Sequence, residues 1–311
     1  IICKSREMKE VFDIARSIAP TEATVLLQGE TGVGKDVIAQ LIHTFSNRKE
    51  RRFVKINCGT LPEQLMESEL FGYDAGAFTG AVKGGKAGLV EYAEKSTLFL
   101  DEIGEMPLSL QPKLLELLQD FKFNRIGSTR KLRADIRVIA STNKNLKELV
   151  EKKLFRDDLF YRLNVIPIEI PPLRDRPDDI IPLINNYLLL FNRKYHVKKR
   201  VAEDAYPVLL SYGWPGNIRE LANCIERLVV TSCKEEIRRS DLPDNMFQNS
   251  SCYDSGVMPD RHCTLKEAVE FCEKEMISRY LDKGYTTEQI GRFLGVNQST
   301  ISRKIARYFS G

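Results

Sequence analysis

Short apolar runs alternate with longer amphipathic segments through the first half of the chain. The runs are rich in Val, Ile, Leu and Phe, as buried strands are, and the longer segments repeat apolar residues at helical spacing. The predicted strands are 24–28, 52–56, 96–100 and 136–140, and the predicted helices between them are 37–44, 61–70, 110–119 and 146–151. Strands that alternate with helices predict a mostly parallel sheet with helices on both faces.

The pattern changes near the proline-rich segment 171–177, after which only helical periodicity follows, at 179–195, 202–211 and 218–233. Residues 242–261 are polar, with Asn, Ser, Asp, Gly and Pro, which is typical of a linker. The last segment, from 264 to 308, is helical again. We therefore predict an α/β subdomain (1–172), an all-α lid subdomain (173–241), a linker (242–262) and a helix-turn-helix domain (263–311).

The last segment is interpreted as a helix-turn-helix because a tight turn at 294–297 joins two helices, of which the second, 298–309, would enter a major groove. Every charged residue from Arg292 onward is basic, as phosphate contacts require. The candidate DNA contacts are Asn297, Gln298, Ser299, Thr300, Arg303, Lys304 and Arg307. A helical hairpin that only dimerises is the alternative.

Composition limits the classes of function. Of the 311 residues, 42% are hydrophobic and 29% charged, which excludes a disordered chain, and the net charge of +4 only weakly favours polyanionic partners. No apolar run reaches the roughly 18 residues of a membrane span. The seven cysteines form no CxxC pair and the three histidines no metal motif, so a reducing, cytoplasmic location is expected. The start at Ile1 instead of Met leads us to expect a fragment with its upstream part missing.

The clearest chemical motif lies between the first predicted strand and its helix. Its eight residues are Gly29, Glu30, Thr31, Gly32, Val33, Gly34, Lys35 and Asp36. Glycines let backbone N–H groups converge on a phosphate at a helix N-terminus, and the lysine adds a positive charge. Asp36 stands where a Ser or Thr hydroxyl would normally bind Mg²⁺. The alternative is a glycine-rich turn with an exposed lysine.

Polar residues follow three predicted strands at the edge where the phosphate loop would lie. Asp101 is predicted to bind Mg²⁺, and Glu102 to orient and deprotonate the attacking water. Asn143 is a candidate for positioning that water, and Asn57 for a hydrogen bond to Glu102. Solvated acids and turn residues are the alternatives, but together with the phosphate loop these residues predict nucleotide hydrolysis.

Two further segments suggest contact surfaces. Residues 72–88 hold six glycines around Phe78, which indicates either a loop with an exposed aromatic tip or a turn with the ring folded inward. Residues 122–133 predict a hairpin that turns at Gly127 and Ser128. Its five basic residues are compatible with a solvated face as well.

These motifs together resemble the central and C-terminal domains of sigma-54-dependent transcriptional activators, the bacterial enhancer-binding proteins of the AAA+ superfamily. Residues 76–81 carry that family's GAFTGA signature unchanged, and its phosphate loop commonly has an acid in the place of Asp36. Residues 155–164 resemble its arginine-finger segment, and 214–221 resemble its lid motif. The resemblance spans residues 1–240 and, more loosely, the helix-turn-helix of the last fifty.

The resemblance implies an AAA+ P-loop NTPase fold, an α/β parallel sheet flanked by helices with an all-α lid, and ATP and Mg²⁺ as cofactors. It implies that Arg156 and Arg162 act as fingers on the neighbouring protomer's nucleotide, and that Arg219 senses the γ-phosphate from the lid. The residues implied to contact sigma-54 are Gly76, Ala77, Phe78, Thr79, Gly80 and Ala81. A homo-oligomer follows, a hexamer when active and a dimer when inactive.

The resulting hypothesis is an ATP-dependent activator that remodels the closed promoter complex of the sigma-54 RNA polymerase holoenzyme. Its helix-turn-helix would hold it on upstream double-stranded DNA, and no membrane partner is expected. Two alternatives remain: a different AAA+ machine with a DNA-binding tail, and a DNA-binding repressor that uses nucleotide only as a ligand.

Overall fold

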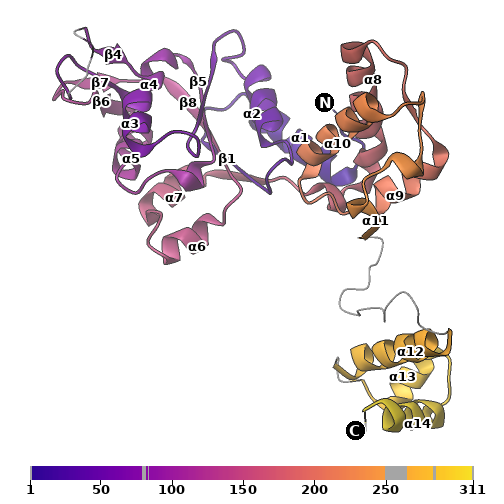
Figure 1. Cartoon of the computed structure of the whole chain (residues 1–311). Coiled ribbons are helices and arrows are strands. Elements are labelled where there is room, and N and C mark those ends of the chain that lie inside the picture. The colour runs from indigo at the N-terminus through magenta and orange to yellow at the C-terminus, as the bar shows by residue number, and fades with distance from the viewer. Residues whose placement is uncertain (1, 79–81, 83, 249–264, 283–284, 310–311) are drawn as a thin grey trace. The chain divides into compact units, whose positions relative to one another are not determined.

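The computed structural model describes residues 2–78, 82, 84–248, 265–282 and 285–309. The chain divides into two compact units, Ile1–Ser250 and Ser251–Gly311 (Figure 1). The first unit contains the sheet and a group of helices that follows it in the chain, and the second contains three helices.

The centre of the first unit is a five-stranded parallel sheet in the order β2-β5-β8-β1-β9. The strands are β1 Val25–Gln28, β2 Phe53–Asn57, β5 Ser96–Asp101, β8 Ile136–Thr142 and β9 Ile166–Glu169. The four predicted strands are present with small shifts at their ends, which confirms the predicted parallel sheet. β9 was not predicted; it contains Pro167 and lies at an edge of the sheet, the position where a strand tolerates proline.

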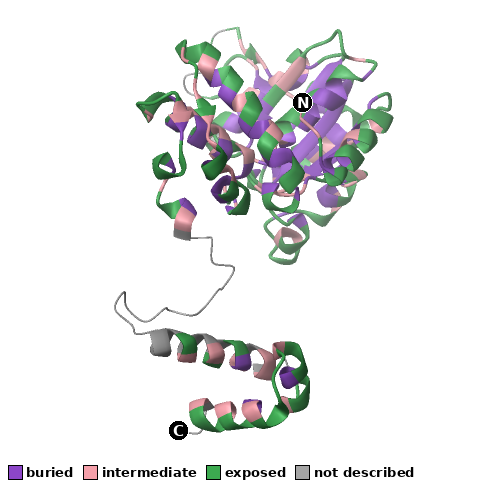
Figure 2. Cartoon of the chain, turned by 90° about the vertical axis from the view of Figure 1, so that its right-hand side faces the viewer, coloured by how far each residue is buried: buried purple, intermediate pink, exposed green. Residues whose placement is uncertain are grey.

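The side chains of the sheet alternate between two hydrophobic clusters, one on each face. Leu98 and Leu100 pack on one face, and Phe99 packs on the other. Figure 2 shows this buried layer in purple within the first unit. The helices of the α/β part are α1 Arg6–Ile18, α2 Lys35–Thr44, α3 Glu63–Phe71, α4 Leu89–Tyr92, α5 Gln111–Asp120, α6 Leu146–Glu151 and α7 Asp157–Leu163. Residues of α1 and α2 cover the Phe99 face, and residues of α3, α5 and α7 cover the opposite face.

Two small antiparallel pairs lie outside the main sheet. Strands β3 Gly72–Tyr73 and β4 Lys86–Ala87 form the base of the glycine-rich segment. Strands β6 Lys122–Asn124 and β7 Lys131–Arg133 form the predicted hairpin, which is confirmed. A bridge between Tyr73 and Ile126 joins the two pairs.

The lid is all-α apart from one pair of two-residue strands, as predicted. Its elements are α8 Ile180–Tyr195, β10 Arg200–Val201, α9 Tyr206–Ser211, α10 Asn217–Thr231, β11 Glu236–Ile237 and α11 Asn245–Gln248. Trp214 is fully buried in its core and donates a hydrogen bond to the Leu209 carbonyl at 2.9 Å. Leu242 and Met246 also belong to this core, so the first residues of the predicted linker are packed against the lid. Because the segment is mostly polar, its composition did not indicate that Leu242 and Met246 pack in the lid core.

The second unit consists of α12 Leu265–Asp282, α13 Thr287–Leu294 and α14 Gln298–Phe309. Ile277, Ile290 and Ile301, one from each helix, form its buried hydrophobic cluster in the described part of the chain. Thr286 caps α13, and Gly295 ends it in the left-handed conformation (φ +65°). The predicted tight turn into a helix at Gln298 is therefore confirmed. Within the described residues, no helix is both long enough and apolar enough to cross a bilayer.

Candidate nucleotide site

The glycine-rich loop joins β1 to α2, as its sequence predicted. Gly34 precedes α2 with φ +104°, and Gly32 has φ +82°, both in the region that favours glycine. A Cβ atom on Gly32 would lie 2.4 Å from the Gly216 carbonyl oxygen of the lid. The loop therefore needs glycine for its own conformation and for the close approach of the lid.

Beside this loop lies a cleft of about 480 Å³. It is bounded by the phosphate loop and α2, by the carboxyl ends of β2 and β5, and by α8 and α10 of the lid. Of the predicted site residues, the cleft brings together Thr31, Gly32, Val33, Gly34, Lys35, Asp36, Asn57, Asp101, Glu102 and Arg219. Pairing β2 with β5 in parallel register places Asn57 opposite Asp101.

Asp101 is held by three donors. Its Oδ1 accepts from the Ser141 hydroxyl at 2.6 Å, and its Oδ2 accepts from Lys55 Nζ at 2.9 Å and from Asn57 Nδ2 at 3.2 Å. Burial alone would raise the pKa of Asp101, but the hydrogen bonds from Ser141 and Lys55 lower it overall. The carboxylate is therefore ionised and fixed in direction, as a metal ligand must be.

Glu102 follows the strand in the left-handed conformation (φ +55°). Its buried Oε2 finds no hydrogen-bond partner within the described residues. The predicted hydrogen bond from Asn57 to Glu102 is wrong. Asn57 donates instead to Asp101, its register partner on the adjacent strand. A buried carboxylate oxygen without a partner is costly, which is compatible with a group kept open for a reacting water.

Lys35 is 6% exposed, and its Nζ donates to the carbonyl oxygens of Gly29 and Glu30 at 2.8 and 3.0 Å. Burial lowers its pKa, and the nearby carboxylates of Glu102 and Asp101 oppose this effect. On the other side of the loop, Asn143 Nδ2 donates to the Thr31 hydroxyl at 2.9 Å. The strand-end asparagine is thus in contact with the phosphate loop.

Sequence reasoning missed several residues that build this site. Lys55 and Ser141 hold Asp101, and Asn217 and Arg176 connect the lid to the phosphate loop. Ser141 lies in a small polar cluster that ends β8, so a signal was present in the sequence. The roles of Lys55 and Arg176 depend on long-range contacts that no local pattern indicates.

Arg156 and Arg162 do not line this cleft. Arg156 precedes α7 as its N-cap and forms an exposed ion pair with Asp158 at 2.7 Å. Arg162 lies within α7 and donates from Nε to the Leu118 carbonyl at 2.9 Å. Both arginines are at the surface of the α/β part and away from the nucleotide cleft of their own chain.

The GAFTGA segment follows β3. Phe78 is 46% exposed, and its ring packs edge-on against Tyr73 with centroids 5.0 Å apart. Gly76 has φ +78°, and Ala77 N–H donates to the Asp74 carbonyl at 3.2 Å. The remaining signature residues Thr79, Gly80 and Ala81 lie outside the described residues.

In the helix-turn-helix unit the predicted DNA contacts differ in their environment. Arg303 on α14 is exposed and forms no ion pair within the described residues. Lys304 and Arg307 on the same helix pair with Glu273 and Glu270 of α12. Residues Asn297, Gln298 and Ser299 at the start of α14 are exposed, and Thr300 is half-buried.

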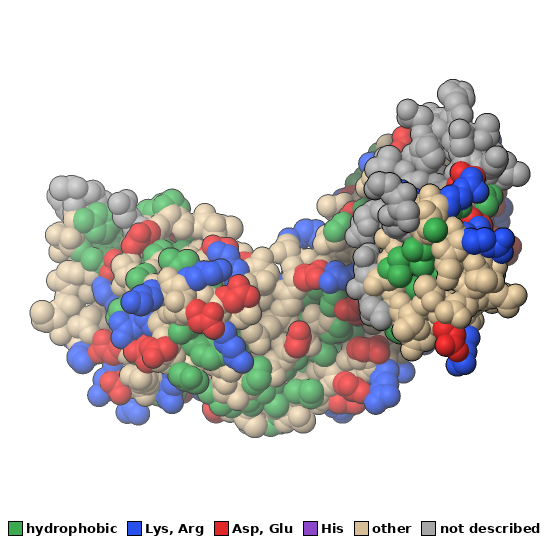
Figure 3. All heavy atoms as spheres, turned by 90° about the horizontal axis from the view of Figure 1, so that it is seen from below, with side chains coloured by type: hydrophobic (Ala, Val, Ile, Leu, Met, Phe, Trp, Pro, Cys, Tyr) green, Lys and Arg blue, Asp and Glu red, His purple; other side chains and the backbone are tan. Residues whose placement is uncertain are grey.

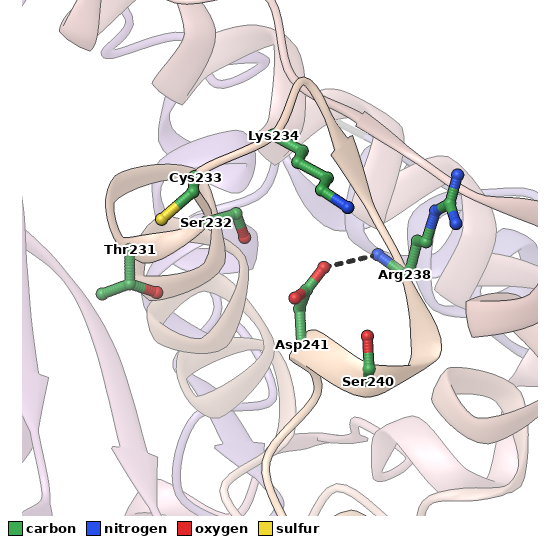
Figure 4. A pocket seen from close by; sticks show the side chains of 7 residues that line it. All are labelled: Thr231, Ser232, Cys233, Lys234, Arg238, Ser240 and Asp241. Atoms are coloured by element: carbon green, nitrogen blue, oxygen red, sulfur yellow. Dashed lines mark hydrogen bonds between the residues drawn. The ribbon is translucent and has the colours of Figure 1, made fainter.

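The surface of the first unit carries charges of both signs (Figure 3) and a second hollow. Figure 3 shows acidic and basic side chains interspersed over the face of the first unit that it presents. Figure 4 shows a second hollow, of about 330 Å³, at the end of α10, where Asp241 accepts from the Arg238 N–H at 2.8 Å. None of the predicted site residues lines that hollow; its lining is Thr231, Ser232, Cys233, Lys234, Arg238, Ser240 and Asp241.

Comparison with known proteins finds three domain families along the chain. Residues 1–169 match the sigma-54 interaction domain, 174–256 match an AAA+ ATPase lid domain, and 262–309 match a helix-turn-helix domain. A solved structure of NtrX from Brucella abortus in complex with ADP has a TM-score of 0.77 and 31% identity. It covers 99% of this chain, which in turn covers 69% of that one.

Among curated proteins, the chain is 42% identical to the putative uric acid sigma-54-dependent transcriptional regulator UacR of Escherichia coli, over 99% of this chain and 53% of UacR. It is 43% identical to the regulatory protein AtoC of Escherichia coli, over 99% of this chain and 67% of AtoC. The chain thus spans about half to two thirds of the length of these relatives. From these matches and the α/β, lid and helix-turn-helix architecture, the chain belongs to the family of sigma-54-dependent transcriptional regulators with an AAA+ domain.

Proposed function

We propose that this chain is an ATP-dependent transcriptional activator that hydrolyses ATP and uses the energy to remodel the closed promoter complex of sigma-54 RNA polymerase. The observation that carries the proposal is the meeting of Lys35, Asp101, Glu102 and Arg219 in one cleft beneath the lid. A cation for phosphate, a ligand for metal, a base for water and a lid arginine are the parts that phosphoryl transfer needs.

Each cleft residue has a role that its environment supports. The backbone N–H groups before α2 and the Lys35 ammonium would bind the β- and γ-phosphates. Asp101, ionised and fixed by three donors, is suited to bind Mg²⁺, which would neutralise charge on the phosphates. Its partner Lys55 is 42% exposed and is free to move aside for the metal. Asp36 lines the same cleft but lacks the hydroxyl that a Ser or Thr at this position would offer to Mg²⁺. Asp101 is therefore the main candidate ligand for Mg²⁺.

Glu102 would accept the proton of the attacking water through Oε2, which has no partner among the described residues. Asn143 is placed against Thr31 of the phosphate loop and would help to position that water. Asn57 would act through Asp101, its hydrogen-bond partner. Arg219, in the first turn of α10, would report on the γ-phosphate from the lid. That nucleotides fit such a cleft is supported by NtrX, whose structures are complexes with ADP and with ATP.

The surface position of Arg156 and Arg162 favours a ring. Because neither arginine lines the cleft of its own chain, a finger role requires a neighbouring protomer. We infer that the active form is a homo-oligomer, a hexamer by resemblance to the family, and that the inactive form is a dimer.

Residues 76–81 would contact sigma-54, with the half-exposed Phe78 ring as the part available to a partner. The α12–α14 unit would bind an upstream double-stranded DNA site in the cytoplasm. Asn297, Gln298, Ser299 and Thr300 are placed to contact bases and Arg303 to contact DNA directly, whereas Lys304 and Arg307 would first leave Glu273 and Glu270.

The central experiment replaces the base without removing the cleft. Glu102→Gln keeps the size of the side chain but removes its proton-accepting charge, so ATP turnover should fall at least about 100-fold while ATP binding persists. Phosphate release and ATP titration calorimetry measure the two properties. Glu105→Gln, which only breaks a surface ion pair with Lys144, is the matched control.

Turnover by Glu102→Gln at the wild-type rate would contradict the assignment of the base. A wild-type chain that binds ATP without any turnover would instead favour the repressor that uses nucleotide only as a ligand.

A further inference from the structure

The lid contacts the phosphate loop through the carbonyl groups of the loop. Three consecutive carbonyl oxygens accept hydrogen bonds from the lid and the segment that leads into it. Thr31 O accepts from Asn217 Nδ2 at 3.1 Å, Gly32 O from the Ile218 N–H at 3.0 Å, and Val33 O from Arg176 Nη2 at 2.8 Å. With the two bonds from Lys35 to the preceding carbonyls, the oxygens of residues 29–33 all have a partner.

These contacts determine where the N–H groups of the loop point. In a trans peptide the carbonyl bond and the next N–H bond point in opposite directions. Holding the carbonyls of residues 31–33 against the lid therefore turns the N–H groups of Gly32, Val33 and Gly34 to the opposite side. Within the described residues, these three N–H groups donate no hydrogen bond, as expected of groups reserved for an anion. Because glycines allow many orientations, the bonds from the lid restrict the loop to this one.

Asn217 lies at the centre of this arrangement. It is fully buried, and its Oδ1 accepts from the Leu173 N–H at 2.7 Å. Its Nδ2 donates both to Thr31 O and to Glu30 Oε2, each at 3.1 Å. Glu30 also forms a two-bond ion pair with Arg174, in the segment between β9 and α8. The Asn217 backbone has φ +53°, a conformation that asparagine, aspartate and glycine accept best.

We propose that Asn217 is a positioning residue that fixes, from the lid, the orientation in which the phosphate loop binds phosphate. Lid docking and phosphate affinity are then coupled, and by linkage a bound phosphate stabilises the docked lid to the same degree. The inference rests on the proposed nucleotide binding and adds to it a residue that does not line the cleft.

The test uses two variants of the whole chain. Asn217→Asp keeps the positive φ and the acceptor for Leu173, but it replaces the donor with an oxygen facing Thr31 O and the Glu30 carboxylate. Asn217→Gly keeps the backbone conformation and removes all three side-chain bonds. The matched control is Asn192→Asp in α8, where Asn192 likewise donates to one carbonyl and accepts from one N–H, both of Lys199, within the lid.

Calorimetric titration with ADP is the main measurement, and thermal unfolding verifies that each variant is folded. We expect Asn217→Asp to weaken ADP binding about 10- to 100-fold, as for a buried donor replaced by an acceptor, and Asn192→Asp to change it less than about twofold. Adenosine has no phosphate, so all variants should bind it with an affinity within about twofold of the wild-type value. Saturation-transfer NMR measures this affinity. Asn217→Gly should weaken ADP binding as well, which would show that charge repulsion alone is not the cause.

Wild-type ADP affinity in a folded Asn217→Asp chain would overturn the inference. An equal loss of ADP and adenosine binding would also overturn it, because that result indicates a lid that is displaced as a whole. If Asn217→Asp does not fold, Asn217→Gly decides between the same outcomes. A wild-type chain without measurable ADP affinity would instead contradict the proposed function itself.

Discussion

At the scale of single residues, the most informative contact is the ion pair between Lys55 and Asp101. Lys55 places a positive charge 2.9 Å from the carboxylate proposed to bind Mg²⁺. The amine and the metal would therefore compete for the same oxygen, so the pair stabilises the cleft in the absence of metal and opposes its binding. A lysine inside a strand gives no local sign of this role, and only the pairing of β2 with β5 reveals it.

This competition gives a prediction for Lys55→Met. A partly exposed ion pair contributes about 0.2–1 kcal/mol, so its removal should lower the Mg²⁺ concentration needed for half-maximal nucleotide binding by roughly 1.5- to 5-fold. A Mg²⁺ titration of ADP affinity measures this change. Lys113→Met, which removes an ion pair with Glu67 remote from the cleft, is the control. An unchanged or higher Mg²⁺ requirement would contradict the prediction.

At the scale of elements, the predicted strands and helices were found where apolar periodicity was strong. β5 and β8 are buried on both faces, so their hydrophobic runs are continuous and easily recognised. The missed elements include β9, interrupted by Pro167 at the sheet edge, α1, which precedes the first predicted strand, and short elements such as α7. The described signature residues of the glycine-rich segment are held at their base by the short β3–β4 pair, which has too few residues to form a pattern.

The turn between α13 and α14 allows a prediction at this scale. Gly295 has φ +65°, and a side chain there would meet no atom within 4 Å, so the effect of a substitution is purely conformational. Gly295→Ala should destabilise the three-helix unit by about 1 kcal/mol, because a non-glycine residue is strained in this region. Amide exchange in α12–α14 of the whole chain should then be roughly fivefold faster.

Gly295→Asn is the matched variant, since asparagine tolerates the left-handed conformation. It should exchange at close to the wild-type rate. Equal exchange in Gly295→Ala and wild type would show that the turn does not limit the stability of this unit.

At the scale of the whole molecule, the position of the arginines decides how the enzyme would be assembled. Arg162 and Arg156 lie outside the cleft of their own chain, so the proposed finger role requires two copies for each complete site. The proposed ring therefore makes turnover depend on protein concentration, unlike a site completed within one chain.

A mixing experiment tests this arrangement. Arg162→Ala chains and Glu102→Gln chains should each be nearly inactive, because a finger arginine contributes about 10³–10⁵-fold to the rate. In a mixed ring, some interfaces pair an intact Glu102 with an intact Arg162, so phosphate release should partly recover. If mixing restores no activity although both variants assemble by light scattering, the arginine acts within its own chain or not at all.

Local sequence patterns were sufficient to predict the chemical groups and the order of the main elements. Periodicity predicted four of the five sheet strands, and the glycine-rich loop with Lys35 and the acids after β5 indicated the candidate nucleotide site, because these signals are local along the chain. Long-range packing is what brings particular groups together: Asn57 bonds Asp101 and not Glu102, Lys55 pairs with Asp101, and Asn217 bonds the phosphate loop from the lid. Asn217 and Thr31 are 186 residues apart, and the distance between them depends on how the lid packs, which no local pattern encodes.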